Sequence, residues 1–138
     1  MRSQEPTVQR SFRLSSRTLE LLDERAAARD VSRNALAEQL LGEAVRTDSH
    51  PLIRFRAAGS GRRRPALIGT RLDVHDVIAT LRDQDGSVEY LGVEVGLVRA
   101  ALAYYADFTD EVDEHAEAAA VLAREERARW DRQQQALR

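Results

Sequence analysis

The sequence predicts a mainly α-helical chain with one short strand and two helices at its start, a small helical domain after them, and a C-terminal helix. Three observations support this prediction. Residues 7–14 alternate apolar and polar side chains, as a half-buried strand does. Leucines and alanines then recur at helical spacing between residues 19 and 45, and again between residues 74 and 105. Residues 110–138 are rich in alanine, glutamate and arginine, a composition that favours helix.

The predicted strand has one apolar and one polar face. Arg10 interrupts the apolar face, which is otherwise formed by Val8, Phe12 and Leu14. The polar face is formed by Gln9, Ser11 and Arg13. A single short strand has unpaired edges, and about 45 residues bury too little surface to be stable alone, so we expect this unit to form a homodimer. Two such strands paired antiparallel make a ribbon that fits the major groove of B-DNA, with the polar face toward the bases.

Two capping patterns predict where the first helices begin. Ser15 is expected to cap a helix that starts at Ser16 and ends near Arg29 and Asp30, where helix propensity falls. Ser32 repeats the pattern for a second helix. The apolar stripe of that second helix is Leu36, Leu40, Leu41, Ala44 and Val45.

The run VQRSFRLSSRTLELLDERAAARDVSRNALAEQLL resembles the ribbon-helix-helix repressors of the Arc, MetJ and CopG group. The resemblance implies a DNA-binding and dimerisation domain over residues 1–46, with Gln9, Ser11 and Arg13 reading base edges. Arginine suits guanine and glutamine suits adenine. The resemblance also implies that the turn residues Ser32, Arg33 and Asn34 hold the DNA phosphates at a helix N-terminus. The alternative is that the polar strand residues are only the solvated face of an edge strand.

Residues 47–64 are predicted to be a linker. Turn-forming residues mark its start at residues 48–51, residues 52–55 suggest a short strand, and residues 57–64 suggest a glycine-containing loop. Residues 50–71 carry six arginines and no acidic residue, so this segment attracts anions. Arg62, Arg63 and Arg64 could contact DNA flanks or an acidic protein surface, or could be a solvated run of charge.

Residues 65–109 have the spacing of a helix-turn-helix. Asp73 is expected to cap a helix that ends near Asp83, with a turn at Gly86 after it. A short helix at residues 87–91, a turn at Gly92 and a third helix at residues 95–106 are expected to follow. The third helix offers only Glu94 and Arg99 at its leading surface, so we expect it to contact protein. DNA reading stays open as an alternative, because Glu94 could accept a hydrogen bond from cytosine.

The runs PALIGTRLDVHDV and LVRAALAYYAD resemble a small bacterial domain of unknown function, family number four-three-three. The matching positions are Gly69, Thr70, Arg71, Val74, Val77, Ala101, Tyr104, Tyr105 and the acidic stretch 110–114. The resemblance departs in the loop RDQDGS. Members of that family look like antitoxins that are encoded beside a PIN-like ribonuclease toxin, and the resemblance implies such a partner here.

Residues 110–138 predict a C-terminal helix that binds a partner. Its apolar stripe of small side chains buries little area, so we expect its distal part to lie against another protein. Trp130 is either an interface anchor or packs on its own domain. An arginine inserted among the metal-binding carboxylates of a PIN-like nuclease would inhibit it. The candidate toxin-binding residues are Arg62, Arg63, Arg64, Arg71, Tyr104, Tyr105, Arg124, Arg127, Arg129, Trp130 and Arg132.

Several classes of site are not expected. The chain has no cysteine, and its three histidines, His50, His75 and His115, lack metal-ligand spacing, so we expect neither a metal nor a cofactor. The neighbouring acids of residues 111–114 are expected to be solvated, so no catalytic constellation and no enzyme activity is predicted. We find no apolar segment of a signal peptide and no run of roughly 18 apolar residues, so we expect a cytoplasmic protein without a membrane partner.

The distribution of charge along the chain indicates that its two ends bind different kinds of partner. The net charge is −2, but residues 1–18 carry four arginines and one glutamate, whereas residues 72–138 carry seven arginines and fifteen acids. The acidic part would repel a phosphate backbone. The sequence therefore predicts an antitoxin that represses its own operon by binding operator DNA as a dimer and neutralises a PIN-like ribonuclease by protein contact. The alternatives are a stand-alone repressor, whose second domain dimerises or senses a ligand, and a plasmid partition protein.

Overall fold

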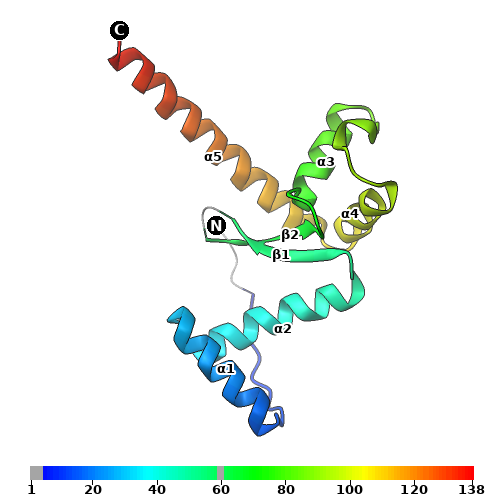
Figure 1. Ribbon diagram of the computed structural model, residues 1–138, viewed down its shortest axis with the longest axis vertical. Coiled ribbons are helices and arrows are strands. Elements are labelled where there is room, and N and C mark those ends of the chain that lie inside the picture. Colours follow the sequence, from blue (N-terminus) through cyan, green and yellow to red (C-terminus); the bar gives the residue numbers. More distant parts are fainter. Residues whose placement is uncertain (1–4, 59–60) are drawn as a thin grey trace. The chain divides into compact units, whose positions relative to one another are not determined.

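The computed structural model describes residues 5–58 and 61–138. Within these ranges the chain is mainly helical, as predicted, and has one two-stranded antiparallel sheet. The elements in chain order are α1 (Ser16–Arg29), α2 (Arg33–Ser49), β1 (Ile53–Ala57), β2 (Arg63–Leu67), α3 (Val74–Asp83), the 3₁₀ helix η1 (Glu89–Leu91), α4 (Val95–Asp107) and α5 (Thr109–Ala136) (Figure 1). The chain divides into two compact units, Met1–Gly42 and Glu43–Arg138, and each is described by itself.

Both helices of the first unit begin at the predicted serine caps. Ser15 is extended, and its Oγ accepts a hydrogen bond from the amide of Thr18 at 3.1 Å. The Oγ of Ser32 accepts one from the amide of Ala35 at 3.0 Å. The first amides of a helix have no acceptor within the helix, so each serine satisfies a donor that would otherwise lack a partner.

The turn between α1 and α2 is made by Asp30 in the left-handed region, with φ 53° and ψ 48°. The amide of Asp30 donates to the carbonyl of Ala27 at 3.1 Å, and the amide of Val31 donates to that of Ala26 at 3.0 Å. This pair of bonds is a Schellman motif, which satisfies the last carbonyls of α1 and ends the helix where its propensity was predicted to fall.

The strand predicted over residues 7–14 is not a strand in the single chain, because residues 5–15 have no regular secondary structure before α1 begins. A strand requires another strand to pair its amides and carbonyls, and the described residues of Met1–Gly42 contain none. The alternation is still present in the extended segment, where Val8, Phe12 and Leu14 are 68%, 74% and 54% exposed.

The second unit begins with the end of α2 and the hairpin of β1 and β2. The antiparallel register pairs Ile53 with Leu67, and both side chains are buried. Phe55 is buried on the same face of β1, whereas Arg54 and Arg56 are exposed on the other face. The short strand predicted near residues 52–55 is therefore confirmed, with its bounds shifted to Ile53–Ala57.

The loop predicted over residues 57–64 is shorter in the structure, because Arg63 and Arg64 belong to β2. The sequence RRPAL of this strand lacks apolar alternation and contains Pro65, which argues against a central strand. In a two-stranded sheet both strands are edge strands, where proline is tolerated. Part of the predicted linker therefore belongs to the core of the second unit.

The helices after the hairpin follow the predicted order. The amide of Asp73 donates to the carboxylate of Asp76 at 2.9 Å at the start of α3. Gly86, with φ 83°, lies in the turn that follows α3 and its C-cap Gln84, and Gly92, with φ 64°, is the C-cap of η1. The short second helix is smaller than predicted and consists only of η1, Glu89–Leu91.

The side chains of one core join the hairpin to α3, α4 and the start of α5. Its buried members are Ile53, Phe55, Leu67, Val74, Val77, Ile78, Val98, Ala101, Tyr104 and Val112. Tyr104 is fully buried, and its hydroxyl donates to the carboxylate of Glu111 at 3.3 Å. Burial raises the pKa of Glu111, while Arg46, whose Nη1 lies 3.0 Å from it, opposes that shift. The end of α2 is thus held to the first turns of α5.

The predicted C-terminal helix is one continuous helix, α5, of 28 residues. Val112 and His115 near its start are buried, whereas residues 121–133 are all exposed. Its acids are concentrated in residues 110–117 and its arginines in residues 124–132, an arrangement that suits the helix dipole. Figure 1 shows its distal half extending beyond the hairpin and α3. No helix of the described residues has the length and apolar character needed to cross a membrane.

Candidate nucleic-acid interface

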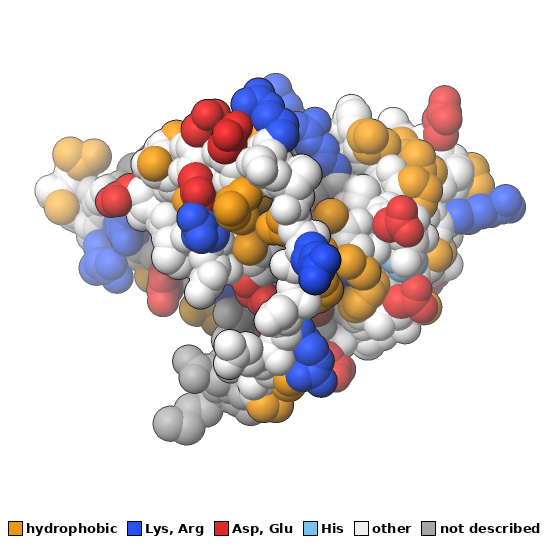
Figure 2. Space-filling model, turned by 90° about the horizontal axis from the view of Figure 1, so that it is seen from below, with side chains coloured by type: hydrophobic (Ala, Val, Ile, Leu, Met, Phe, Trp, Pro, Cys, Tyr) orange, Lys and Arg blue, Asp and Glu red, His pale blue; other side chains and the backbone are white. Residues whose placement is uncertain are grey.

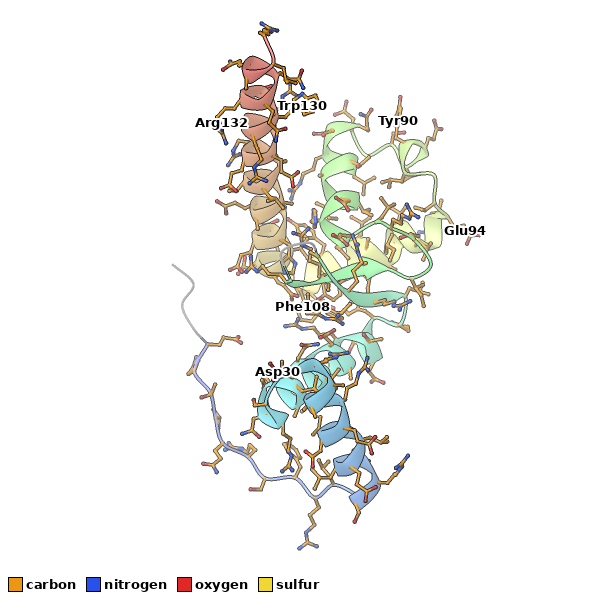
Figure 3. The ribbon with its side chains drawn as sticks, turned by 60° about the vertical axis from the view of Figure 1, so that its left-hand side comes forward. Asp30, Tyr90, Glu94, Phe108, Trp130 and Arg132 are labelled. Atoms are coloured by element: carbon orange, nitrogen blue, oxygen red, sulfur yellow. The ribbon has the colours of Figure 1, made fainter. Side chains whose placement is uncertain are left out.

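The three predicted base-reading residues lie in the extended segment before α1. Gln9, Ser11 and Arg13 are all exposed, and the segment is drawn in Figure 3 as an extended chain with side chains projecting from it. Because Val8 and Phe12 occupy the alternate positions, the polar residues share one side of an extended chain. The single chain therefore carries both faces of the predicted ribbon without the strand pairing that would form it.

The first unit buries very little of its apolar surface. Among its described residues only Ala26 and Leu36 are buried, at 5% and 1% exposure. Its exposed large apolar side chains are Val8, Phe12, Leu14, Leu21, Val31, Leu40 and Leu41. Figure 2 shows one face of the molecule, on which hydrophobic side chains, in orange, lie at the surface among charged ones. Fully burying one exposed side chain of this size is worth roughly 1.5–3 kcal/mol, and less where the side chain is already partly covered, so covering this apolar surface would be favourable.

The predicted phosphate-binding turn lies at the start of α2. The Oγ of Ser32 already caps the helix, and the guanidinium of Arg33 forms two hydrogen bonds, of 2.5 Å and 2.8 Å, with the carboxylate of Asp23. This hydrogen bond lowers the pKa of Asp23 and raises that of Arg33. The first turn of α2 contains no acidic residue, so the amides and the helix dipole remain favourable to an anion. Arg33 is held in place by Asp23, a partner that the sequence analysis did not predict.

Two of the predicted toxin-binding arginines form ion pairs inside the second unit. The Nη2 atom of Arg63 lies 2.6 Å from the carboxylate of Glu43. Arg64 is only 11% exposed, and its Nη1 lies 3.6 Å from the carboxylate of Asp73 and 3.3 Å from Nε2 of His75. Their charges are therefore partly balanced by acids of the same unit.

The two predicted toxin-binding tyrosines also have partners in the second unit. Tyr104 is a core residue, so its side chain is not on the surface. Tyr105 is half-buried, and its hydroxyl accepts a hydrogen bond from Arg82 at 2.7 Å and donates one to Asp113 at 2.8 Å. In the structure, both tyrosines that the family resemblance indicated help to hold α4 to its neighbours, Tyr104 to α5 and Tyr105 to α3 and α5.

The remaining candidates lie where a partner could reach them. Arg71 is exposed, and Arg62 is half-buried at the base of the hairpin loop. Arg127 is exposed on α5, and Trp130 is 57% exposed. Figure 3 shows Trp130 and Arg132 on the distal part of α5, well away from Phe108 at the junction with α4. A shallow depression on this helix is lined by Ala123, Arg124, Arg127, Ala128 and Asp131.

A cluster around the buried carboxylate of Asp73 was missed by the sequence analysis. Nε of Arg56 lies 2.6 Å from this carboxylate, and Nε2 of His75 lies 3.2 Å from it, with Arg64 at 3.6 Å. Burial tends to raise the pKa of Asp73, but the hydrogen bonds from His75 and Arg56 outweigh it and hold the pKa below its usual value. The signal in the sequence was the six arginines of residues 50–71, which require an acid from elsewhere.

The same cluster brings possible metal ligands of Asp73, His75 and Asp76 within 4.8 Å of one another. Two guanidinium groups already lie within 3.6 Å of the Asp73 carboxylate. Their positive charge disfavours a divalent cation at this position. The geometry therefore fits an ion-pair cluster better than a metal centre.

We expect Asp73→Asn to lower the free energy of unfolding at pH 7 by about 2 kcal/mol, because it leaves Arg64 buried beside a neutral group. The native pKa of Asp73 lies below the unfolded value, so the carboxylate stabilises the fold above that unfolded value, near pH 3.8. This contribution is lost as the pH falls through the native pKa, and the difference between wild type and variant should then disappear. Urea unfolding between pH 7 and pH 2.5 measures it.

Asp131→Asn on the exposed part of α5 is the matched control, and its effect should stay within about 0.5 kcal/mol at every pH. A difference between wild type and Asp73→Asn that does not change with pH would contradict the assigned ion pairs.

Comparisons of the chain with protein-family models, with curated proteins and with solved structures found no match.

Proposed function

We propose that this chain is an antitoxin that binds operator DNA as a ribbon-helix-helix dimer, represses its own operon, and neutralises a PIN-like ribonuclease through its second unit. The observation that carries the DNA-binding part is the exposed alternation of residues 7–14. Val8, Phe12 and Leu14 belong to a unit whose buried residues, among those described, are only Ala26 and Leu36. A second copy of the same segment would bury these side chains and pair the backbone at the same time.

The alternation restricts how two segments can pair. Residues opposite each other in an antiparallel pair lie on the same face of the ribbon, so apolar residues of one copy must lie opposite apolar residues of the other. This requires the two-fold axis that relates the copies to pass through a residue and not between two residues. Pairing centred on Ser11 uses the whole segment. It places Val8 opposite Leu14 of the second copy and Gln9 opposite Arg13. The apolar side chains of both copies then face the helices, and the polar side chains form one surface for the major groove.

The start of α2 supplies contacts to the DNA backbone in this proposal. The amides of its first turn and the positive end of its dipole attract a phosphate. Ser32, Arg33 and Asn34 lie there, and the bond to Asp23 fixes the guanidinium of Arg33 in one position. These groups would position the dimer without reading sequence.

The toxin-binding part of the proposal is supported by the distal half of α5. Residues 121–133 are all exposed, and they carry Arg124, Arg127, Arg129 and Arg132 together with Trp130 and the acids Glu125, Glu126 and Asp131. Arginine forms bidentate pairs with carboxylates, and tryptophan is enriched among interface residues that dominate binding. An acidic nuclease active site has the complementary chemistry.

Phe12→Asp should abolish the dimer, because it places a charge where two apolar faces meet. Sedimentation equilibrium should give twice the chain mass for the wild type and one chain mass for the variant. Tyr90→Asp is the matched control, since Tyr90 is 70% exposed in the second unit, and it should remain dimeric. A wild-type chain that is monomeric at micromolar concentration would contradict the proposal.

Arg13→Ala should reduce sequence preference, with a loss of about 1–3 kcal/mol on the DNA upstream of the chain's own reading frame and little loss on a random duplex. Arg33→Ala should weaken binding to both duplexes alike, because its role is toward phosphate. Fluorescence anisotropy at fixed salt measures both. Equal losses on the two duplexes for Arg13→Ala would remove its base-reading role.

Co-expression with the product of the adjacent reading frame tests the antitoxin role. The full chain should bind that protein and suppress its ribonuclease activity, and the double variant Arg127→Glu, Trp130→Ala should lose both effects while it still binds DNA. A nuclease that stays active and unbound in the presence of the full chain would favour a stand-alone repressor.

A further inference from the structure

We infer that the arginine face of the β1–β2 hairpin is a second nucleic-acid surface, which binds the phosphate backbone of duplex DNA from the second unit. In the proposed function, duplex DNA contacts only the first unit. The inference takes from that proposal only duplex DNA as the ligand, and it rests on residues of Glu43–Arg138.

The hairpin register brings the arginines to one face. Arg54 and Arg56 are two residues apart on β1, and Arg56 is paired directly with Arg64 of β2. Residues 71–73 run along the other edge of β2, where Asp73 forms a bridge with Ala66. The carbonyl of Arg71 accepts a bond from Nη2 of Arg56 at 3.5 Å. Arginines that are separated in sequence therefore surround one stretch of the sheet.

The acids of this face cannot balance its positive charge. Asp73 is the buried carboxylate that Arg56, Arg64 and His75 share, and Asp76 lies 3.5 Å from the other ring nitrogen of His75. The Nε atom of Arg64 is buried and has no hydrogen-bond partner in the described structure. Two guanidinium groups thus share one carboxylate, so their positive charge is only partly offset.

Three further arginines add charge that no acid of the described residues offsets. No ion pair involves Arg54, Arg62 or Arg71 within residues 5–58 and 61–138, and Arg54 and Arg71 are exposed. This contrasts with Arg63, which pairs with Glu43. Arg54 and Arg71 are therefore the groups that can reach a ligand.

The chemistry favours a phosphate backbone as the ligand. Side chains two residues apart on a strand are about 6.6 Å apart, which is close to the spacing of successive phosphates on one nucleic-acid strand. Guanidinium groups bind phosphate in a bidentate manner, and a two-stranded ribbon fits the major groove. Neutralising phosphates also releases counterions, so each contact has a measurable signature in the salt dependence.

The test compares full-length wild type with the double variant Arg54→Ala, Arg71→Ala. Both positions are exposed, so the fold should be kept, which circular dichroism and the unfolding midpoint verify. The matched control is Arg99→Ala, Arg138→Ala, which removes the same charge from two other exposed positions of the unit. The probes are two duplexes from the DNA upstream of the chain's own reading frame. The short one covers only the stretch that the chain protects in a footprint, and the longer one adds the flanks of that stretch.

On the long duplex, the hairpin variant should bind about tenfold more weakly at 50 mM salt, and the slope of log affinity against log salt should decrease in magnitude by about 2. On the short duplex, the hairpin variant should bind as tightly as the wild type. The Arg99→Ala, Arg138→Ala control should bind both duplexes as tightly as the wild type. If the hairpin variant binds the long duplex with unchanged affinity and slope, the inference is overturned and the proposed function is unaffected. If that variant also loses binding to the nuclease, the hairpin surface is a protein-binding surface.

The reverse result is also distinguishable. The wild type could bind every duplex with the same affinity while the hairpin variant binds them all more weakly. That result would support the hairpin surface and would contradict the proposed recognition of an operator. Absence of DNA binding by the wild type would overturn both.

Discussion

The DNA-binding proposal depends on one constraint, which is that the segment before α1 cannot complete its own structure. Its backbone needs a second strand, and its alternate apolar side chains need a surface to cover them. The single chain provides neither, since residues 5–15 are irregular and Phe12 is 74% exposed. The two serine caps and the Schellman turn show that the helices behind the segment are locally well specified. What remains uncovered is apolar, both in the segment and on the helices, where Leu21, Leu40 and Leu41 are exposed.

The second unit, in contrast, covers its own apolar core and pairs several of its own charges. Its core joins a hairpin to three helices, and several of its ionic groups are paired inside it, including Arg46 with Glu111 and Arg63 with Glu43. Arginines gather at the hairpin, where residues 50–71 contain no acid. The distal half of α5 is mixed, because Glu125, Glu126 and Asp131 lie among its arginines. The hairpin is therefore the clearest basic surface of this otherwise acidic unit.

Local chemistry allowed much of the fold to be predicted from the sequence. Ser15, Ser32 and Asp73 marked helix starts, and Gly86 and Gly92 marked turns, because each acts through its own backbone or its near neighbours. Strand β2 was missed, since arginines and a proline hide its alternation and only the pairing with β1 reveals it. Residues 7–14 have the reverse problem, because their alternation is clear but the described residues of the first unit contain no strand that could pair with them.

The candidate sites show the same limit. Gln9, Ser11 and Arg13 could be selected from the alternation of the sequence alone, although in the single chain the apolar residues between them are exposed as well. The roles of Arg33, Arg64 and Tyr104 do not, because each depends on a residue elsewhere in the chain: Asp23, Asp73 and Glu111. A sequence pattern identifies an arginine as a cation, but only the fold shows whether an acid of the same chain already holds it.

The central claim is that residues 7–14 of two copies pair as an antiparallel ribbon. The most direct measurement is an isotope-filtered nuclear Overhauser experiment on a dimer assembled from one labelled and one unlabelled chain. The account predicts intermolecular contacts between Val8 and Leu14, and between the backbones on either side of Ser11. A dimer without intermolecular contacts in this segment, or with contacts only between residues of the second unit, would contradict it.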